Sequence, residues 1–229
     1  MKNAKSFTNV NQLFELSTEL IDKYDDLIEF VPMVQKQGFF PICTGTIDGS
    51  TDLSKLNIMI VGQDFGTKKD YDKKKIAEKG ENIEKQSTWK NLKPMLNNLG
   101  INPNECFYTN LLLGLRTTDS NVGISPALEN IDYVNQCIEF FQKQVEAIQP
   151  KLIIFLGKVT YAICAEKKTK KTEIDKLQYI KNIIELNKTR PTYNNINCLY
   201  LIHPSFRTLQ MSKNLWSEEN EKINPNKNF

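Results

Sequence analysis

The sequence has little of what metal centres and membrane spans require. It contains a single histidine, His203, and its five cysteines include no C-x-x-C pair. We therefore expect neither a zinc site nor an iron–sulfur cluster, and thiols so widely spaced argue against a metalloenzyme. There is no run of about 18 apolar residues, so no membrane span is predicted. Residues 1–5 are not followed by the apolar stretch of a signal peptide, so we expect a cytoplasmic protein.

The composition is that of a globular protein with one domain of the larger kind. Apolar residues make up 40% and charged residues 25% of the 229 residues, a balance typical of folded domains. We expect a single domain over residues 1–229, with a helical extension over 1–55 and a flexible tail over 220–229. The cysteines lie mostly within apolar runs, which predicts buried free thiols in a reducing compartment.

Positive charge is concentrated in two segments, although the net charge is only +3. Residues 68–90 contain eight lysines and five acids, and residues 158–190 contain nine basic residues and four acids. Each segment follows an expected strand, and this asymmetry suits a polyanion that approaches that face of the molecule. A solvated Lys-rich surface is the alternative interpretation.

Four short apolar runs, each ending in a polar or glycine turn, indicate the strands of a parallel sheet. They cover residues 57–61, 106–109, 151–156 and 197–202. Helical spacing or helix caps mark residues 11–35, 87–99, 125–149, 159–165, 173–186 and 208–219, and the stretch 111–122 is typical of a long loop. Strands that alternate with helices predict an α/β fold with helices on both faces of the sheet.

Polar or glycine residues follow every expected strand. Gln63 and Asp64 follow the first, and Asn110, Gly157 and His203 follow the other three. The carboxyl ends of parallel strands meet at one edge of the sheet, which is where open α/β sheets bind ligands. The pattern therefore predicts one site built from residues far apart in the sequence.

Each of these side chains also has an ordinary structural interpretation. Asp64 could orient water or stabilise a developing cation, or it could serve as a turn residue or helix cap. Asn110 could read a pyrimidine edge through its amide, or form an Asx turn. His203 could hydrogen-bond a carbonyl oxygen that gains charge, or be structural. Ser87 and Ser205 could bind phosphates or cap the helices that follow them.

Taken in order, the motifs resemble those of the uracil-DNA glycosylase superfamily. Its members carry a G-Q-D-P-Y-H or G-E-x-P-G motif, then an apolar run ending in Asn, then an L-x-G turn and H-P-S. The corresponding residues here are Gly62-Gln63-Asp64, Phe107-Tyr108-Thr109-Asn110, Phe155-Leu156-Gly157 and His203-Pro204-Ser205. Residues 87–92 are also similar to the serine-containing helix start between the first two motifs, and the resemblance covers residues 56–210.

The resemblance implies a three-layer α/β/α fold with a central four-stranded parallel sheet. It also implies hydrolysis of the N-glycosidic bond of a flipped base in DNA, with no metal or organic cofactor. The catalytic residues would then be Asp64, which positions water and stabilises the cation, and His203, which hydrogen-bonds the pyrimidine O2. The other site residues would be Gly62, Gln63, Phe65, Asn110 and Gly157 for the base, and Ser87, Ser205 and Arg207 for DNA.

The sequence departs from the family pattern at positions that select or stack on the base. Phe65 replaces the usual proline, and Gly66-Thr67 replaces the Tyr-His that excludes thymine in one branch of the family. The aromatic residue that stacks on the base has no clear counterpart, with Tyr71 and Phe65 as candidates. Phe206-Arg207 follows Ser205 in place of a proline and an apolar wedge. The identity of the base is therefore left open.

Three functions follow as hypotheses. The first is a DNA glycosylase that acts on uracil or a related deaminated base, as a monomer whose partner is DNA, single-stranded DNA included. The second is an inactive protein of the same fold that binds nucleic acid or a modified base, and the third is a hydrolase of free nucleosides or nucleotides. Asp64 and Asn110 favour the first over the second, and the two basic segments favour a polymeric substrate over the third.

Overall fold

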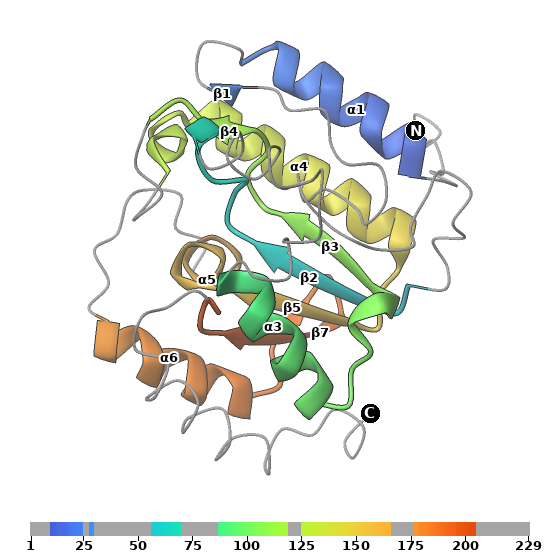
Figure 1. Cartoon of the computed structure of the whole chain (residues 1–229), viewed down its shortest axis with the longest axis vertical. Coiled ribbons are helices and arrows are strands. Elements are labelled where there is room, and N and C mark those ends of the chain that lie inside the picture. The colour runs from blue at the N-terminus through green and yellow to red at the C-terminus, as the bar shows by residue number, and fades with distance from the viewer. Residues whose placement is uncertain are drawn as a thin grey trace.

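Four parallel strands form the centre of the computed structural model, which describes residues 10–24, 28–29, 56–69, 87–118, 125–165 and 176–204 (Figure 1). They lie in the order β3-β2-β5-β7, with bounds Cys106–Asn110, Ile58–Gly62, Leu152–Leu156 and Ile196–Leu201. All residues of β3 and β5 are buried. Strands covered on both faces have continuous apolar runs, which is why the sequence showed no alternation here. The predicted α/β class is confirmed.

In the described part of the chain, a fifth strand joins the four parallel strands that were predicted. The fifth, β6 (Thr192–Tyr193), pairs antiparallel with β7 at the edge of the sheet. The turn between them is Asn194-Asn195, and both residues have positive φ, 49° and 66°. Two positive φ angles in a two-residue loop are the requirement of a type I′ hairpin turn, which asparagine tolerates. A two-residue strand is too short to leave a periodic signal, so only the asparagine pair could have indicated it.

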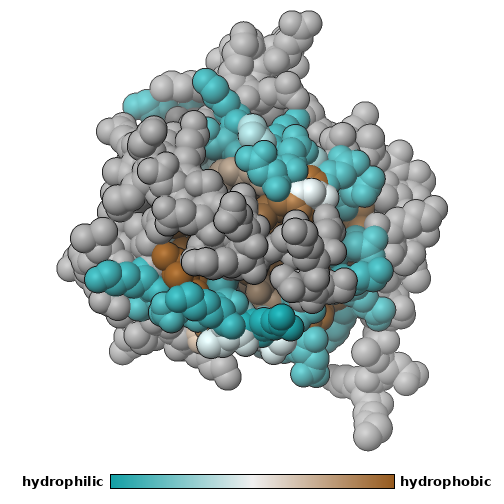
Figure 2. All heavy atoms as spheres, turned by 90° about the horizontal axis from the view of Figure 1, so that it is seen from below, coloured by the Kyte–Doolittle hydropathy of each residue, from teal (hydrophilic) through white to brown (hydrophobic). Residues whose placement is uncertain are grey.

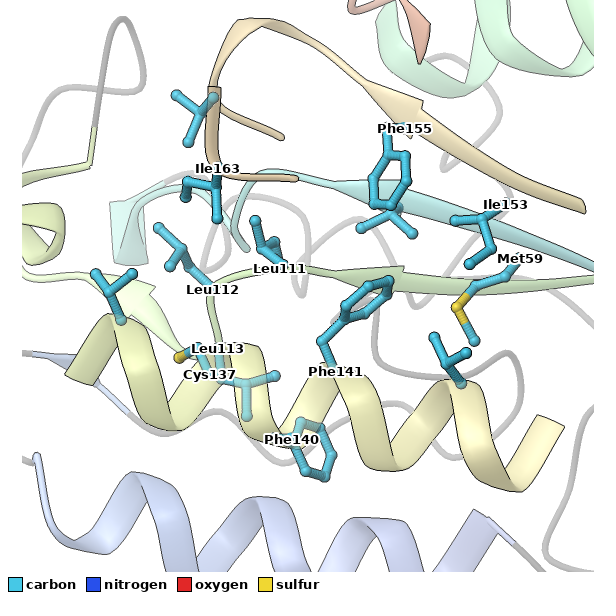
Figure 3. Close-up of a cluster of buried hydrophobic side chains, with 14 of the residues drawn as sticks. Met59, Leu111, Leu112, Leu113, Cys137, Phe140, Phe141, Ile153, Phe155 and Ile163 are labelled. Atoms are coloured by element: carbon cyan, nitrogen blue, oxygen red, sulfur yellow. The ribbon is translucent and has the colours of Figure 1, made fainter. Parts of the chain in front are cut away.

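The larger apolar core lies between the sheet and α4 (Ile131–Ile148) (Figure 3). Phe141 points from α4 toward the sheet, and its ring centroid lies 5.9 Å from that of Phe155 in β5. The helix α1 (Val10–Asp22) runs along the outer side of α4 (Figure 1). Two further helices, α5 (Lys158–Cys164) and α6 (Lys176–Lys188), contribute residues to the same core.

A second core lies on the other face of the sheet, under α3 (Ser87–Asn98). Leu92 and Leu96 of this helix are fully buried, and they belong to one apolar cluster with Tyr108 and Ile154. Gly100 follows the helix in a turn, and its φ of 73° lets the N–H of Ile101 donate to the Leu96 carbonyl at 2.9 Å. This is the glycine stop that the sequence predicted. Helices therefore cover both faces, and the three-layer architecture is confirmed.

The start of α4 differs from the prediction. Residues Pro126–Glu129 form a 3-10 turn, and the α-helix begins only after Asn130, whose Oδ1 accepts from the N–H of Tyr133 at 3.0 Å. Asparagine is among the strongest helix N-caps, so it competes with Ser125 for that role. The change of helix type turns Ile131 outward, and this side chain is 45% exposed. Leu128, in the 3-10 turn, remains buried in the core.

Two very short strands replace parts of an expected helix and an expected loop. The helix predicted over 11–35 ends at Asp22, and Ile28–Glu29 forms β1. Within the predicted loop 111–122, Leu115–Arg116 forms β4, which pairs antiparallel with β1. Periodicity cannot reveal strands of two residues, because each shows only one side chain per face. The expected last helix and tail lie outside the described residues.

In the described part of the chain, no helix is long and apolar enough to cross a membrane. Figure 2 shows the described surface from below, where hydrophilic residues surround a centre at which apolar residues are visible.

Candidate active site

The four expected strand ends lie together at the carboxyl edge of the sheet. Gly62 at the end of β2 pairs with Asn110 at the end of β3. On the other side, the N–H of Gly157, just after β5, donates to the carbonyl of Leu201 at 2.8 Å. His203 follows β7 by two residues. The register of the parallel strands therefore places all the sequence-predicted strand-end residues along one edge.

Asp64 is held by three hydrogen bonds. Its Oδ2 accepts from Arg116 Nε at 2.8 Å and from Gln63 Nε2 at 3.0 Å, and its Oδ1 accepts from the N–H of Gly66 at 3.0 Å. The bond to Gly66 is the Asx turn that was the structural interpretation of this residue. The bond to Arg116 is a buried ion pair in which the arginine side chain is 5% and the aspartate side chain 7% exposed. Asp64 is therefore both a turn residue and a fixed charged group.

The loops after β2 and β3 continue the hydrogen bonding of these strands. The N–H groups of Leu111 and Leu112 donate to the carbonyls of Gly62 and Gln63, each at 2.9 Å. Further along, the N–H of Arg116 donates to the Gly66 carbonyl at 2.8 Å. This backbone ladder brings Arg116 to Asp64. The apolar run before Arg116 is fully buried, which places the arginine at the margin of the core.

Asn110 has a buried amide with an open donor. The side chain is 1% exposed, and within the described part of the chain Nδ2 has no hydrogen-bond acceptor. A buried polar group without a partner costs about 1–3 kcal/mol, so such atoms call for an explanation. Among the described residues, no backbone N–H donates to the Asn110 side chain, so the Asx turn of its structural interpretation does not form there. An acceptor atom of a ligand would satisfy it.

Behind Asn110, a second buried polar pair links β3 to α4. Thr109 Oγ1 donates to Gln144 Oε1 at 2.7 Å, and both side chains are fully buried. Gln144 Nε2 also lacks an acceptor among the described residues. The pair fixes the carboxyl end of β3 against α4. Sequence reasoning missed Gln144, although a glutamine on the apolar face of a helix is a signal of a buried polar contact.

His203 lies against Gly157 and within the electrostatic reach of Asp64. Burial lowers the pKa of His203 to about 4, and the negative charge of Asp64 partly opposes that change. The imidazole is therefore neutral at physiological pH and can donate one hydrogen bond. A Cβ on Gly157, whose φ is 95°, would lie 3.3 Å from the His203 Cβ. Glycine at this position is what lets the histidine approach β5.

The turn that carries His203 is tied to α3. Asn91 Nδ2 donates to the carbonyl of Pro204 at 2.9 Å. Ser87 is the first residue of α3, as its motif predicted, so the helix that starts at this serine also anchors the H-P-S turn. Ser205, Arg207 and Tyr71 lie outside the described residues.

Phe65 is 6% exposed and packs in the core between the sheet and α4. Its expected role toward the base stays a prediction.

Arg116 is the site residue that sequence reasoning missed. It was assigned to a loop, and it lies in none of the motifs described above. A signal was present, because Arg116 directly follows a run of leucines that a folded domain buries, and a charge carried into a core needs a partner. The partner lies 52 positions earlier in the sequence, so no local pattern identified it.

Among the described residues, no group of three or more His, Cys, Asp and Glu side chains lies close enough to hold a metal ion. The four described cysteines are free, and three of them are buried. Burial raises the pKa of Cys137 to about 11, so this thiol stays protonated at neutral pH. The prediction of free thiols is confirmed for these four, and Cys43 lies outside the described residues.

Comparison with known families matches residues 49–226 to the model of the uracil DNA glycosylase superfamily. The match covers most of the chain and includes every motif residue of the carboxyl edge. The chain therefore belongs to the uracil DNA glycosylase superfamily, as its motifs indicated. A search of curated proteins finds no match.

Proposed function

We propose that this protein is a DNA glycosylase that hydrolyses the N-glycosidic bond of uracil or a related deaminated base. The observation that carries the proposal is the pairing of a fixed carboxylate, Asp64, with a neutral imidazole, His203, at one edge of the sheet. Family membership supports DNA as the partner. The assignment of the reaction depends on the chemistry of the Asp64 carboxylate and the His203 imidazole.

The reaction builds positive charge on the sugar and negative charge on the base, and Asp64 and His203 suit these two charges. As the bond between C1′ and the base nitrogen breaks, its electron pair leaves with the base and positive charge builds on the sugar. Asp64 would orient the water whose oxygen bonds to C1′, and the proton that this water loses ends on the released base. His203 would donate its N–H to the base carbonyl that gains negative charge. A neutral imidazole keeps the proton it needs for that bond.

Base recognition would come from Asn110. Its Nδ2 is buried and lacks an acceptor within the described part of the chain, so a carbonyl oxygen of the base could fill the position. An amide that donates to a carbonyl discriminates uracil from cytosine, which presents an amino group there. Satisfying a buried unpaired donor also contributes to binding, because the cost of leaving it unpaired disappears.

A second function, binding without cleavage, is favoured by one observation. The Arg116 guanidinium lies 2.8 Å from Asp64 and offsets part of the negative charge that would stabilise a sugar cation. A protein that only recognised a flipped base would keep Asn110 and would tolerate this compensation.

Incubation with oligonucleotides separates the two functions. Purified protein is incubated with single- and double-stranded oligonucleotides that contain uracil, hypoxanthine or no damaged base, and abasic sites are cleaved with alkali. The proposed function predicts strand cleavage for a deaminated base, none for undamaged DNA, and a loss of cleavage in Asp64→Asn. Tight binding to the damaged oligonucleotide with no cleavage would instead support the binding protein.

A further inference from the structure

The ion pair between Asp64 and Arg116 is an expensive way to stabilise a fold. Both side chains are nearly inaccessible, and their charged atoms lie 2.8 Å apart. Removing two charges from water costs about as much as their attraction returns, and apolar residues of similar volume often stabilise a protein as well or better. A requirement for stability alone therefore does not explain the pair. A requirement for a carboxylate that is held in one orientation explains it.

The hydrogen bonds of Asp64 leave one acceptor position open. A carboxylate offers about four lone-pair positions, two on each oxygen. Oδ2 accepts from Arg116 and Gln63, and Oδ1 accepts from Gly66. Within the described part of the chain, the open position lies on Oδ1. With Oδ2 held from two directions, the carboxylate cannot rotate, and Oδ1 keeps a single orientation.

We propose that Arg116 is a positioning residue that fixes Oδ2 of Asp64, so that Oδ1 orients the water used in base release. This inference rests on the proposed function. Arg116 acts through Asp64 and does not itself contact the base. Because the guanidinium offsets part of the carboxylate charge, the orientation of water becomes the larger part of what Asp64 supplies.

The fold holds Arg116 from two sides. Its N–H donates to the Gly66 carbonyl at 2.8 Å, which ties β4 to the loop that carries Asp64. On the other side β4 pairs with β1, where Ile28 lies opposite Arg116. The family match begins at residue 49, so β1 lies outside it. A segment outside the shared family region therefore helps to place the arginine.

The positioning role is tested by single-turnover release of uracil from an oligonucleotide. The variants are Arg116→Gln, Arg116→Lys, Asp64→Asn and the double variant Asp64→Asn/Arg116→Gln. Arg116→Gln should lower the maximal rate by about 10–100-fold, because a displacement on the order of 1 Å can cost about 10²-fold in rate. The oligonucleotide concentration that gives half the maximal rate should change little. Arg116→Lys, which keeps a buried cation, should recover part of the rate, and Arg116→Gln should add little once Asp64 is replaced.

Folding is checked by thermal unfolding of every variant, with an exposed ion pair as the matched control. Lys188 Nζ lies 2.7 Å from Glu185 on α6, and these side chains are 51% and 71% exposed. Glu185→Gln, which breaks this pair without removing a basic residue, should leave the rate unchanged. If Arg116→Gln fails to fold because it leaves a buried carboxylate unpaired, Arg116→Lys replaces it in the test. A maximal rate of Arg116→Lys below that of the wild type supports the positioning role, and a wild-type maximal rate overturns it.

The contribution of β1 is tested by Glu29→Pro, which removes a backbone N–H from the strand that pairs with β4. We expect a lower maximal rate and an unchanged dependence on oligonucleotide concentration. An unchanged rate would show that β1 does not help to place Arg116.

Two results would overturn the positioning role while the proposed function stands. One is a wild-type rate in Arg116→Gln. The other is an equal fractional loss from this substitution with and without Asp64. If the wild-type protein releases no base from any oligonucleotide, the proposed function fails, and the inference fails with it.

Discussion

Replacing Gly157 with alanine should damage both the fold and the site, by amounts that follow from the structure. Gly157 has φ 95° and ψ 174°, a region that is essentially restricted to glycine. Its N–H donates to Leu201 at 2.8 Å, and its carbonyl accepts from Thr160 Oγ1 at 2.9 Å, so the backbone cannot relax without losing these bonds. The strain should cost about 1–3 kcal/mol, which lowers Tm by roughly 2–12 °C in a protein of this size.

The same substitution should move His203. The new Cβ would lie 3.3 Å from the His203 Cβ, closer than most Cβ contacts, and 3.6 Å from its Cδ2, which is an ordinary contact distance. The imidazole must therefore shift, and base release should slow because its hydrogen bond to the base is misdirected. Thermal unfolding and single-turnover uracil release measure the two effects separately.

Gly100→Ala is the matched control for Gly157→Ala. Gly100 has a positive φ of 73° and is exposed at the end of α3, on the opposite edge of the sheet. Alanine there should lower Tm through backbone strain of about 1–2 kcal/mol and leave the rate of base release unchanged. A wild-type Tm in Gly157→Ala would refute the strain argument. A lowered Tm with an unchanged rate would refute the link between Gly157 and His203.

Three further predictions concern the polar groups of the site. Asp64→Asn should lower the rate of base release by about 10²-fold or more with little change in DNA binding, and gel-shift titration beside single-turnover kinetics measures both. Asn110→Leu should abolish base release without lowering Tm, because it removes a donor that has no partner in the described residues. Thr109→Val should instead lower Tm, because it leaves the buried Oε1 of Gln144 without its hydrogen-bond donor. His203 should titrate with a pKa of about 4, and NMR can read this directly because the chain has only one imidazole. Folding lowers this pKa from 6.5 to about 4, so between pH 6.5 and pH 4 the native state binds fewer protons than the unfolded state. The free energy of unfolding of the wild type should therefore fall as the pH drops from about 6.5 to 4. It should fall less in His203→Ala.

The central sheet could be predicted from the sequence because each parallel strand is buried on both faces. The run from Leu152 to Leu156 is apolar throughout, and the chain alternates such runs with helical patterns. The strand ends followed from the same pattern, and the ordered motifs then identified the family. Asn110 and His203 could be placed at one edge because parallel strands end together.

The features that could not be predicted depend on contacts between distant residues, which leave no local pattern in the sequence. The two-residue strands β1, β4 and β6 are set by their partners rather than by periodicity. The start of α4 depended on a competition between two N-caps, Ser125 and Asn130, which the local sequence does not rank. Arg116 was missed because its ion-pair partner, Asp64, lies 52 positions away in the sequence.

The most direct test of the account is to detect the free base itself. Wild-type protein and Asp64→Asn are each incubated, in excess, with an oligonucleotide containing one uracil, and the small-molecule fraction is analysed by mass spectrometry over time. The proposed function predicts stoichiometric free uracil from the wild type, together with an intact abasic strand, and release at least about 10²-fold slower from Asp64→Asn. Free uracil at equal rates from both proteins, or none from the wild type at full occupancy of the DNA, would contradict it.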